Sequence, residues 1–520
     1  MRIGLDVGGT HTDAVLLSGT DVVAATKTPT TADVTGGVRN ALRDLLSEPV
    51  AARVRAVMIG TTTFTNALVE GKRLTPTAAI RLGLPATAAI PPMTGWPARL
   101  REALRGRWRL CDGGYEYDGS TLSEVVPEQL RAAAEELAGE GVRAVAVSSV
   151  FAPVNGDAEL RAAQIVGETV PELRVTCSHE VGSIGLLERE NAAILNAALG
   201  ELAEETIAAL TAAVADSGVT APLLLSQNDG TLMALDHARR FPIRAIASGP
   251  TNSMRGAALL SGVDDCAVID IGGTTTDIGV LSGGVPREAS SLTTLAGVRT
   301  NGRMPDLLSL GIGGGSLVRG DTVGPDSVGH DLTTRALAFG GSTLTATDLA
   351  TAAGWADVGD RSLLDGVDPA RARRVLAGIG RRIADAVDRM RTSPEPLPAV
   401  VVGGGSVLLP HPTEELPDLR RPEHYAVANA IGAAIAAVGG EVDRVVHFGT
   451  RRRRDVLAEA KEEAVARAEA AGARAGSVRV VALEEIPLAY LTSGATRVRI
   501  KAVGDLDIDR LPGEPEVSCA

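Results

Sequence analysis

The first residues of the chain group into short apolar runs separated by polar turns. Apolar runs cover 3–7, 14–17 and 22–27, and residues 35–46 carry apolar side chains at helical spacing. Short apolar runs bounded by Gly, Thr and Asp are typical of consecutive antiparallel strands. The pattern therefore predicts a three-stranded meander followed by a helix.

Further along, strand-like and helix-like segments alternate. Strands are predicted at 54–59, 144–150, 173–177, 222–226, 243–247 and 399–402, and helices at 127–138, 157–166, 186–215, 251–261, 368–391 and 425–438. After 450 a charged helix is predicted at 456–471, with strands near 478–482 and 496–502. Alternation of this kind is typical of an α/β fold with a parallel sheet.

One short pattern occurs twice. The first copy reads LDVGGTHTD (5–13) and the second reads IDIGGTTTD (269–277). Each joins an apolar strand that ends in Asp to a second apolar run through a Gly-Gly-Thr turn. Because glycine has no Cβ, the N–H groups of such a turn can approach an anion closely, and Thr hydroxyls add donors. Two copies predict duplicated half-domains that grip one polyphosphate from both sides; two ordinary glycine-turned hairpins are the alternative.

The charge and composition of the chain limit the classes of partner that we expect it to bind. The 520 residues carry a formal charge of −13, and aromatic residues make up only 2%. An acidic chain is a poor match for nucleic acid or an anionic membrane, and no apolar run is long enough to span one. The four Cys form no CxxC pair, and the N-terminus shows no signal peptide, so we expect a cytoplasmic enzyme with an aliphatic core.

Polar residues at the ends of predicted strands are candidate substrate contacts. These are Thr61, Thr62, Asn66, His179 and Asp229. Loops at the carboxyl ends of strands are where open α/β sheets bind ligands. Simpler alternatives exist for each: Thr residues cap helices, Asn-Asp-Gly forms turns, and His179 serves as a general base, a metal ligand or a loop hydrogen bonder. Neither His179 nor His330 can be assigned a role from the sequence.

Residues near 84–125 differ from the rest in holding two of the three Trp and two of the four Tyr. A small inserted subdomain with its own core is the favoured interpretation, and a substrate or partner surface is the alternative. The arginines of the helix at 368–391 are expected on a solvated face.

Several motifs in a shared order resemble the hydantoinase A/oxoprolinase family of the actin-like ATPase superfamily, in its short A-subunit form. They are GTTTFTNAL (60–68), SHEV (178–181), SQNDG (226–230) and PIRAIASGP (242–250), together with the two hairpins and GGGS at 403–406. The resemblance implies an actin-like ATPase (ribonuclease H-like) α/β fold with duplicated lobes around a nucleotide cleft and a small C-terminal α/β segment. We expect an N-terminal lobe at 1–190, a second lobe at 191–450 and a cap at 451–520.

The resemblance also implies residue roles. The hairpins match the phosphate 1 and phosphate 2 motifs, 403–406 the adenosine motif, and 191–200 and 425–438 the connect 1 and connect 2 helices. Asp6 and Asp270 are then the catalytic and Mg²⁺-binding residues. ATP would be bound by Gly8, Gly9, Thr10, Thr12, Gly272, Gly273, Thr274, Thr275, Gly403, Gly404, Gly405 and Ser406.

The function implied by the family is ATP-dependent activation of a cyclic amide. The carbonyl oxygen of a hydantoin or lactam is phosphorylated before ring opening, with ATP and Mg²⁺ as cofactors and a hydrolase B-type partner subunit in an oligomer. A stand-alone small-molecule kinase and an activator ATPase that acts on another protein remain alternatives. The identity of the substrate is the part of the resemblance that carries over least well to this chain. The Thr-x-Gly-Phe-x-Asp stretch usual in longer members of the family is absent near 84.

Overall fold

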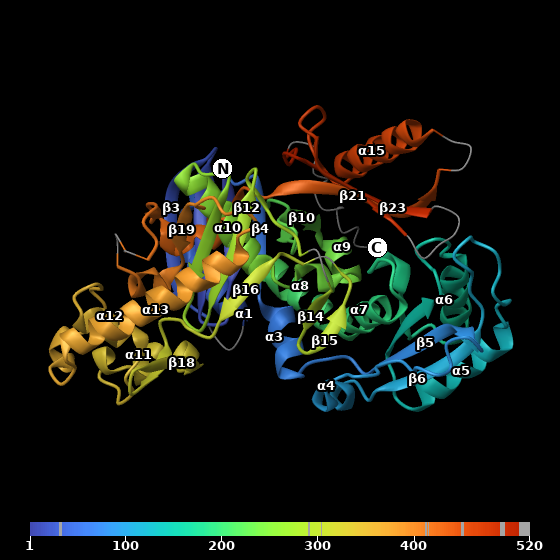
Figure 1. Cartoon of the computed structure of the whole chain (residues 1–520), viewed down its shortest axis with the longest axis horizontal. Coiled ribbons are helices and arrows are strands. Elements are labelled where there is room, and N and C mark those ends of the chain that lie inside the picture. The colour runs from blue at the N-terminus through green and yellow to red at the C-terminus, as the bar shows by residue number, and fades with distance from the viewer. Residues whose placement is uncertain are drawn as a thin grey trace.

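The computed structural model of the chain describes residues 1–30, 34–289, 292–302, 304–410, 413, 415–448, 452–488 and 495–508. Three sheets and the helices that cover them make up most of this region (Figure 1). Most segments form the element that their periodicity predicts. The predicted helices at 127–138, 157–166 and 368–391, for example, are α5 (Pro127–Gly139), α6 (Asp157–Thr169) and α13 (Pro369–Met390).

The first lobe is built on a nine-stranded sheet with the order β22-β23-β21-β10-β9-β4-β1-β2-β3. Its strands are β1 (Arg2–Val7), β2 (His11–Ser18), β3 (Asp21–Pro29), β4 (Ala56–Thr61), β9 (Leu223–Ser226), β10 (Thr231–Ala234), β21 (Ala437–His447), β22 (Arg479–Pro487) and β23 (Ala495–Gly504). β1 pairs antiparallel with β2 and parallel with β4, and β4 pairs parallel with β9. The predicted N-terminal meander is confirmed.

The second lobe repeats this arrangement around β11 (Cys266–Ile271). β11 pairs antiparallel with β12 (Thr276–Ser282) and parallel with β19 (Ala399–Val402), which pairs with β20 (Leu419–Arg420). The far edge of β12 carries β13 (Val285–Pro286) and β16 (Leu307–Leu310). In register, Asp6 lies opposite Asp13 and Asp270 lies opposite Asp277. The repeated order and register confirm the predicted α/β fold with duplicated lobes.

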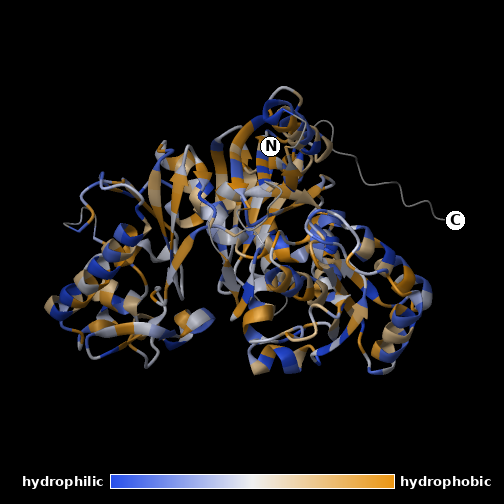
Figure 2. Ribbon diagram, turned by 45° about the vertical axis from the view of Figure 1, so that its right-hand side comes forward, coloured by the Kyte–Doolittle hydropathy of each residue, from blue (hydrophilic) through white to orange (hydrophobic). Residues whose placement is uncertain are grey.

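Both lobes have aliphatic cores, as the scarcity of aromatic residues predicts. On the first sheet, β1 and β4 pack against α1 (Val34–Leu45) and α8 (Gly200–Ala215) through residues such as Ile3, Leu42 and Leu210. In the second lobe, β11 packs against α12 (Ala346–Ala352) and α13 through Ile269 and Ile379. Hydrophobic residues concentrate in the central strands, while the peripheral helices are two-faced (Figure 2).

A third, four-stranded parallel sheet stands apart from the two lobe sheets, with the order β6-β5-β7-β8. Its strands are β5 (Thr77–Leu84), β6 (Arg107–Asp112), β7 (Ala144–Ser149) and β8 (Arg174–Cys177). Helices α5 and α6 pack on one face. The inserted unit therefore reaches beyond the predicted 84–125. Of its tryptophans, Trp96 is buried and Trp108 is exposed.

The lobes are connected through two crossing helices, α10 (Ser248–Ser261) and α14 (Ala428–Ala434). They cross at glycines: a Cβ on Gly432 would lie 1.8 Å from the carbonyl oxygen of Asn252, and one on Gly256 would lie 1.9 Å from that of Ala428. The predicted connect 2 helix thus holds this position. The prediction of connect 1 at 191–200 is wrong, because α7 (Leu186–Ala198) packs on β7 and its place beside α14 is taken by α10.

Three other predicted elements differ from the structure. The helix predicted at 186–215 is broken at Leu199 into α7 and α8. The strand predicted at 243–247 is a 3₁₀ helix (Pro242–Ala245) that begins at a proline. The helix predicted at 425–438 ends at Ala434, and β21 begins three residues later. The small residues of that stretch allow close packing in a helix or in a strand, so periodicity alone did not show where the helix ends and the strand begins.

The C-terminal segment extends the first sheet. β21, β23 and β22 continue it beyond β10, and α15 (Arg453–Ala470) covers them. Strand pairing thus places β9, β10 and β21 in the sheet of the first lobe, although they lie within the expected second lobe at 191–450; the domain boundaries stay a prediction. Among the described residues, no helix combines the length and apolar character needed to cross a membrane.

The remaining elements complete the periphery. They are α2 (Glu48–Ala51), α3 (Thr63–Glu70), α4 (Ala98–Ala103), α9 (Leu235–Arg240), α11 (Leu332–Arg335), β14 (Thr293–Leu295), β15 (Val298–Thr300), β17 (Ser316–Arg319) and β18 (Thr322–Ser327). The pairs β14–β15 and β17–β18 are separate two-stranded hairpins.

Candidate phosphate-binding site

The two Gly-Gly-Thr turns have the same geometry and face each other. Each is closed by one backbone hydrogen bond, from the N–H of Gly8 to the carbonyl of His11 (3.0 Å) and from that of Gly272 to Thr275 (2.9 Å). A Cβ built on Gly273 would lie 3.5 Å from the side chain of Thr10 in the other lobe. The sequence motif that occurs twice is therefore brought together across the lobes.

The residues of the turns differ in what they offer to a ligand. Gly9, Thr274 and Thr275 are exposed, and Gly8, Thr10, Gly272 and Gly273 are half-buried. Thr12, also predicted to bind the nucleotide, is fully buried, and its hydroxyl lies 3.3 Å from that of Thr30. Its counterpart Thr276 donates to the carbonyl of Ile312 (2.7 Å). These two hydroxyls brace the turns from below and leave the exposed backbone to meet a ligand.

Asp6 and Asp270 lie at the bases of the two turns, Asp6 buried and Asp270 half-buried. Asn429 of α14 donates to Oδ2 of Asp6 (2.9 Å), and Ser253 of α10 donates to Oδ2 of Asp270 (2.5 Å). Oδ1 of Asp6 is buried without a hydrogen-bond partner among the described residues. Such an oxygen has lost its hydrogen bonds to water without gaining one from the described protein groups. This is typical of a position that binds a cation or a reacting group.

Burial and mutual repulsion make both carboxyl groups hard to ionise. Burial raises the pKa of Asp6 to about 7, with further increases from the charges of Asp13 and Asp270. Burial likewise raises the pKa of Asp270 to about 6, against the opposing hydrogen bond from Ser253. Strongly shifted carboxyl groups that face one another are characteristic of catalytic and metal-binding positions.

Lys27 on β3 is the one cation within this group of acids that the described residues supply. Its ammonium donates to both carboxylate oxygens of Asp13 (2.6 and 2.8 Å) and to the carbonyl of Ala426 in the other half of the chain (3.3 Å). A Cβ on Gly404 would lie 3.6 Å from Cε of Lys27. Lys27 thus spans from the first hairpin to the GGGS loop. Asp277 is instead bonded by Ser309, and burial raises its pKa.

Sequence reasoning missed Lys27, Asn429 and Ser253. Lys27 carried a local signal, since β3 follows the first hairpin directly and its register places Lys27 opposite Asp13. The other two carried none, because Asn429 and Ser253 reach the aspartates from helices far away in the sequence.

Two glycine-rich loops enclose the second turn. Gly314 and Gly315 donate backbone hydrogen bonds to the carbonyls of Gly272 and Gly273 (3.0 and 2.7 Å). On the other side, a Cβ on Gly403 would lie 2.3 Å from Oδ1 of Asp270, a position that also has a φ of +85°. Gly404 is exposed, whereas Gly405 and Ser406 are buried and shape the loop from within. The predicted GGGS loop therefore lies against the second phosphate turn.

The loop after β4 adjoins the first turn. A Cβ on Gly60 would lie 2.5 Å from Oδ1 of Asp6, and one on Gly9 would lie 3.7 Å from the amide nitrogen of Asn66. Thr61 is buried and shares a hydrogen bond with Thr63 (2.8 Å), while Thr62 bonds back to the carbonyl of Val7. Asn66, in the first turn of α3, is exposed beside the turn, where it can contact a bound molecule.

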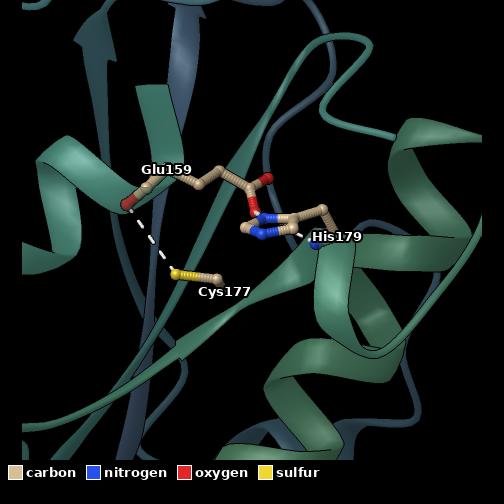
Figure 3. Close-up of side chains that lie close together, drawn as sticks. All are labelled: Glu159, Cys177 and His179. Atoms are coloured by element: carbon tan, nitrogen blue, oxygen red, sulfur yellow. Dashed lines mark hydrogen bonds and ion pairs between the residues drawn. The ribbon is translucent and has the colours of Figure 1, made fainter. Parts of the chain in front are cut away.

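His179 lies in the third-sheet unit and is held by Glu159 (Figure 3). Its Nδ1 is 2.7 Å from Oε2 of Glu159, a fully buried carboxylate that also accepts from Ser149 N, Ser178 Oγ and His179 N. Cys177 lies close enough to complete a three-residue metal set. However, its thiol bonds a backbone carbonyl and burial raises its pKa to about 12. The geometry is that of a polar brace rather than a prepared metal site.

Asp229 is held in a structural ion pair and lies away from the hairpins. It is 3.0 Å from Nζ of Lys501 on β23 and accepts hydrogen bonds from the backbone and hydroxyl of Thr231. The Lys501 charge and these bonds hold its pKa well below the usual range against the effect of burial. His330 is exposed beside Asp331. Neither Asp229 nor His330 lies at the two Gly-Gly-Thr turns.

Comparison with known proteins identifies two family models in the chain. A model described as the hydantoinase/oxoprolinase N-terminal region matches residues 2–170, and one described as hydantoinase/oxoprolinase matches residues 189–390. The chain is 29% identical over 419 residues to the caprolactamase subunit alpha of Pseudomonas jessenii, covering 74% of this chain and 58% of that protein. It is 27% identical over 394 residues to the acetophenone carboxylase gamma subunit of Aromatoleum aromaticum, covering 66% and 52%.

Solved structures show the same fold. The ATP-dependent caprolactamase from Pseudomonas jessenii superposes with a TM-score of 0.77 at 21% identity, covering 97% of this chain and 87% of that one. A nucleotide-free acetone carboxylase superposes with a TM-score of 0.70 at 18% identity, covering 99% and 89%. The matched stretches span little more than half the length of the curated relatives. The two family models cover most of the residues that build both lobes, and the chain belongs to the hydantoinase/oxoprolinase family.

Proposed function

We propose that the chain binds ATP between its lobes and transfers the terminal phosphoryl group to the carbonyl oxygen of a small molecule. One observation carries this proposal: two Gly-Gly-Thr turns from different lobes face each other, with the buried Asp6 at the base of one and the half-buried Asp270 at the base of the other. Catalysis of phosphoryl transfer is mostly positioning of phosphates and neutralisation of their charge. Facing turns with free backbone donors serve both needs.

Each part of the site then has a role. The N–H groups of both turns bind the phosphates, and Gly403, Gly404, Gly405 and Ser406 form the wall for the adenosine. Lys27 supplies positive charge beside the first turn. The unpartnered oxygen of Asp6 and the repulsion between Asp6 and Asp270 fit a divalent cation. These two residues would hold Mg²⁺, which neutralises phosphate charge when bound.

The substrate class that we favour is a lactam or related cyclic amide, because a caprolactamase subunit is among the relatives. The carbonyl oxygen forms a bond to the terminal phosphorus as the bond from that phosphorus to ADP breaks, and ADP leaves with the electron pair. The amide carbon then carries phosphate as its leaving group. One water adds to this carbon and the bond to the ring nitrogen breaks, so the ring opens to an amine, which takes up a proton, and an acyl phosphate. A second water then cleaves the acyl phosphate to a carboxylate and inorganic phosphate.

We further propose that ring opening takes place on a partner subunit of the hydrolase B type. Both curated relatives are named as subunits of larger enzymes, and the chain matches little more than half of each. We also propose a cytoplasmic location, which is supported by the three described cysteines being free and buried, as in a reducing compartment.

A ketone is the second candidate substrate. The likeness to the acetophenone carboxylase gamma subunit favours it, and so does the fold shared with acetone carboxylase. The chemistry at the hairpins would be the same, because a ketone also presents a carbonyl oxygen to the terminal phosphate. Phosphorylation of the enol form would prepare the neighbouring carbon for carboxylation.

The test is ADP release by the purified chain with Mg·ATP, in the presence of lactams, hydantoins, 5-oxoproline, or ketones with bicarbonate. Asp6→Asn and Asp270→Asn should each reduce substrate-stimulated release at least about 100-fold, since small losses of positioning have such effects. Asp321→Asn, an exposed carboxylate on the β17–β18 hairpin, is the matched control and should leave release unchanged.

The pattern of stimulation separates the candidates. Stimulation by a ring compound, lost in both hairpin variants, supports amide activation, while stimulation by a ketone supports the second candidate. Absence of ATP binding in the unmodified chain, or full release in both variants, would refute the proposal.

A further inference from the structure

A cavity of about 450 Å³ lies away from the hairpins, where β1, α10 and the C-terminal segment meet. Its charged lining is mostly basic: Arg2, Arg255, Arg474, Arg479 and Lys501 face it, against the carboxylates Asp229 and Asp505. The chain as a whole carries a formal charge of −13. A concave surface with the opposite sign of charge concentrates anions.

The acids do not neutralise this lining. Lys501 pairs with the lining carboxylate Asp229 at 3.0 Å and with Glu288 at 2.9 Å, and the charge of the other lining carboxylate, Asp505, acts on Arg2. Within the described residues, Arg255, Arg474 and Arg479 have no ion pair with any carboxylate. Three guanidinium groups from α10, from the loop after α15 and from β22 thus share one cavity with their charges unpaired.

Arg255 is the lining residue whose contacts most favour a bound ligand. Its Nη2 donates to the carbonyl of Ile435, where α14 ends (3.2 Å), but its Nε is buried and has no partner in the described part of the chain. Burial lowers its pKa; the charge of Asp229 opposes this effect and that of Arg479 adds to it. A buried donor without an acceptor destabilises the protein unless something binds there.

We propose that this cavity binds a small oxyanion with two or more phosphate or carboxylate groups, clamped by Arg255, Arg474 and Arg479. Guanidinium groups match oxyanions with paired hydrogen bonds, and the volume lies within the usual range of ligand pockets. The site is separate from the ATP site and does not require the reaction proposed above. Arg255 follows Ser253, the donor to Asp270, by two residues on α10, so an anion here contacts the helix that supports the second hairpin.

The test is calorimetric titration of the whole nucleotide-free chain at low salt, with pyrophosphate in one series and citrate in the other. One saturable site is expected at the cavity for each anion, in addition to any pyrophosphate bound at the phosphate turns. Arg255→Met and the exposed Arg479→Gln should each weaken it at least about ten-fold, since a hydrogen bond to a charged group contributes that much. Arg454→Gln, an exposed arginine on α15 outside the cavity, is the matched control and should leave binding unchanged.

A hairpin variant separates this site from the phosphate turns. Gly273→Val fills the space beside Thr10 and should leave anion binding at the cavity unchanged. Binding of both anions supports a general oxyanion site, and binding of pyrophosphate alone supports a phosphate-bearing ligand. The proposal is overturned by three outcomes: no saturable binding of either anion, equal affinity in Arg479→Gln, or loss of binding in Gly273→Val.

Discussion

At the scale of single residues, Asp6 is buried, Asp270 is half-buried, and the charge of Asp270 acts on Asp6. Burial raises the pKa of Asp6 to about 7 and that of Asp270 to about 6, from an ordinary aspartate pKa of 3.8. A carboxyl group whose pKa is higher in the folded than in the unfolded chain favours folding only while it is protonated. The fold therefore maintains two ionisable groups at a cost in stability.

This predicts that the free energy of unfolding of the nucleotide-free chain falls between about pH 4 and pH 7 through these two groups. Asp6→Asn removes the charge but keeps the shape, so it should stabilise the chain by about 1–3 kcal/mol at pH 8 and by much less at pH 5. Urea denaturation at both pH values measures the difference. An equal change at the two pH values would show that the Asp6 carboxyl is not perturbed as described.

We expect Lys27 to contribute to the stability of the chain, because it is the cation that pairs with the buried Asp13. Lys27→Met should destabilise the chain by about 1–3 kcal/mol, the usual cost of leaving a buried charge without its partner. Lys27→Arg retains the charge and serves as the matched variant. Thermal unfolding of both variants is the measurement, and a Lys27→Met chain as stable as the parent would contradict this role.

The hairpin residues could be predicted because their chemistry is local: a strand, two glycines and a threonine are contiguous in the sequence. The prediction that Thr12 binds the ligand did not allow for its position at the start of β2, where its side chain turns inward to Thr30. Ser253 and Asn429 could not be predicted, because only the crossing of α10 and α14 brings them to the aspartates.

At the scale of elements, the crossing of α10 and α14 depends on glycine. Both helices approach so closely that neither Gly256 nor Gly432 has room for a Cβ. Because α10 supports Asp270 and α14 supports Asp6, this crossing sets the distance between the two carboxylates. The small-residue pattern at 425–438 predicted close packing correctly, but no sequence pattern indicated that α10, rather than 191–200, is the partner.

Gly432→Ala should therefore destabilise the chain by about 2 kcal/mol or more, as overpacking in a tight core does. Gly378→Ala in α13 is the matched control, since a Cβ there would meet nothing closer than a flexible arginine terminus at 3.8 Å. That control should stabilise by about 0.5–1 kcal/mol, the helix preference of Ala over Gly. Similar chemical denaturation midpoints for the two variants would disprove the close crossing.

At the scale of the whole molecule, two lobes with the same strand order present the same turn to each other. The duplication was predictable because the motif occurs twice, whereas the extension of the first sheet by β21, β23 and β22 was not, since those strands follow the second lobe in the sequence. The central claim is that a nucleotide occupies the space between the turns of the two lobes.

A reversible cross-link across that space tests the claim directly. Cβ of Thr10 would lie 3.9 Å from a Cβ on Gly273, within the range of a disulfide, and the three native cysteines that the structure describes are buried. In the double variant Thr10→Cys, Gly273→Cys, oxidation should join the lobes and abolish Mg·ATP binding, and reduction should restore it, as measured by titration calorimetry with the disulfide verified by mass spectrometry. Equal ATP affinity in the oxidised and reduced chain would contradict a nucleotide held between the hairpins.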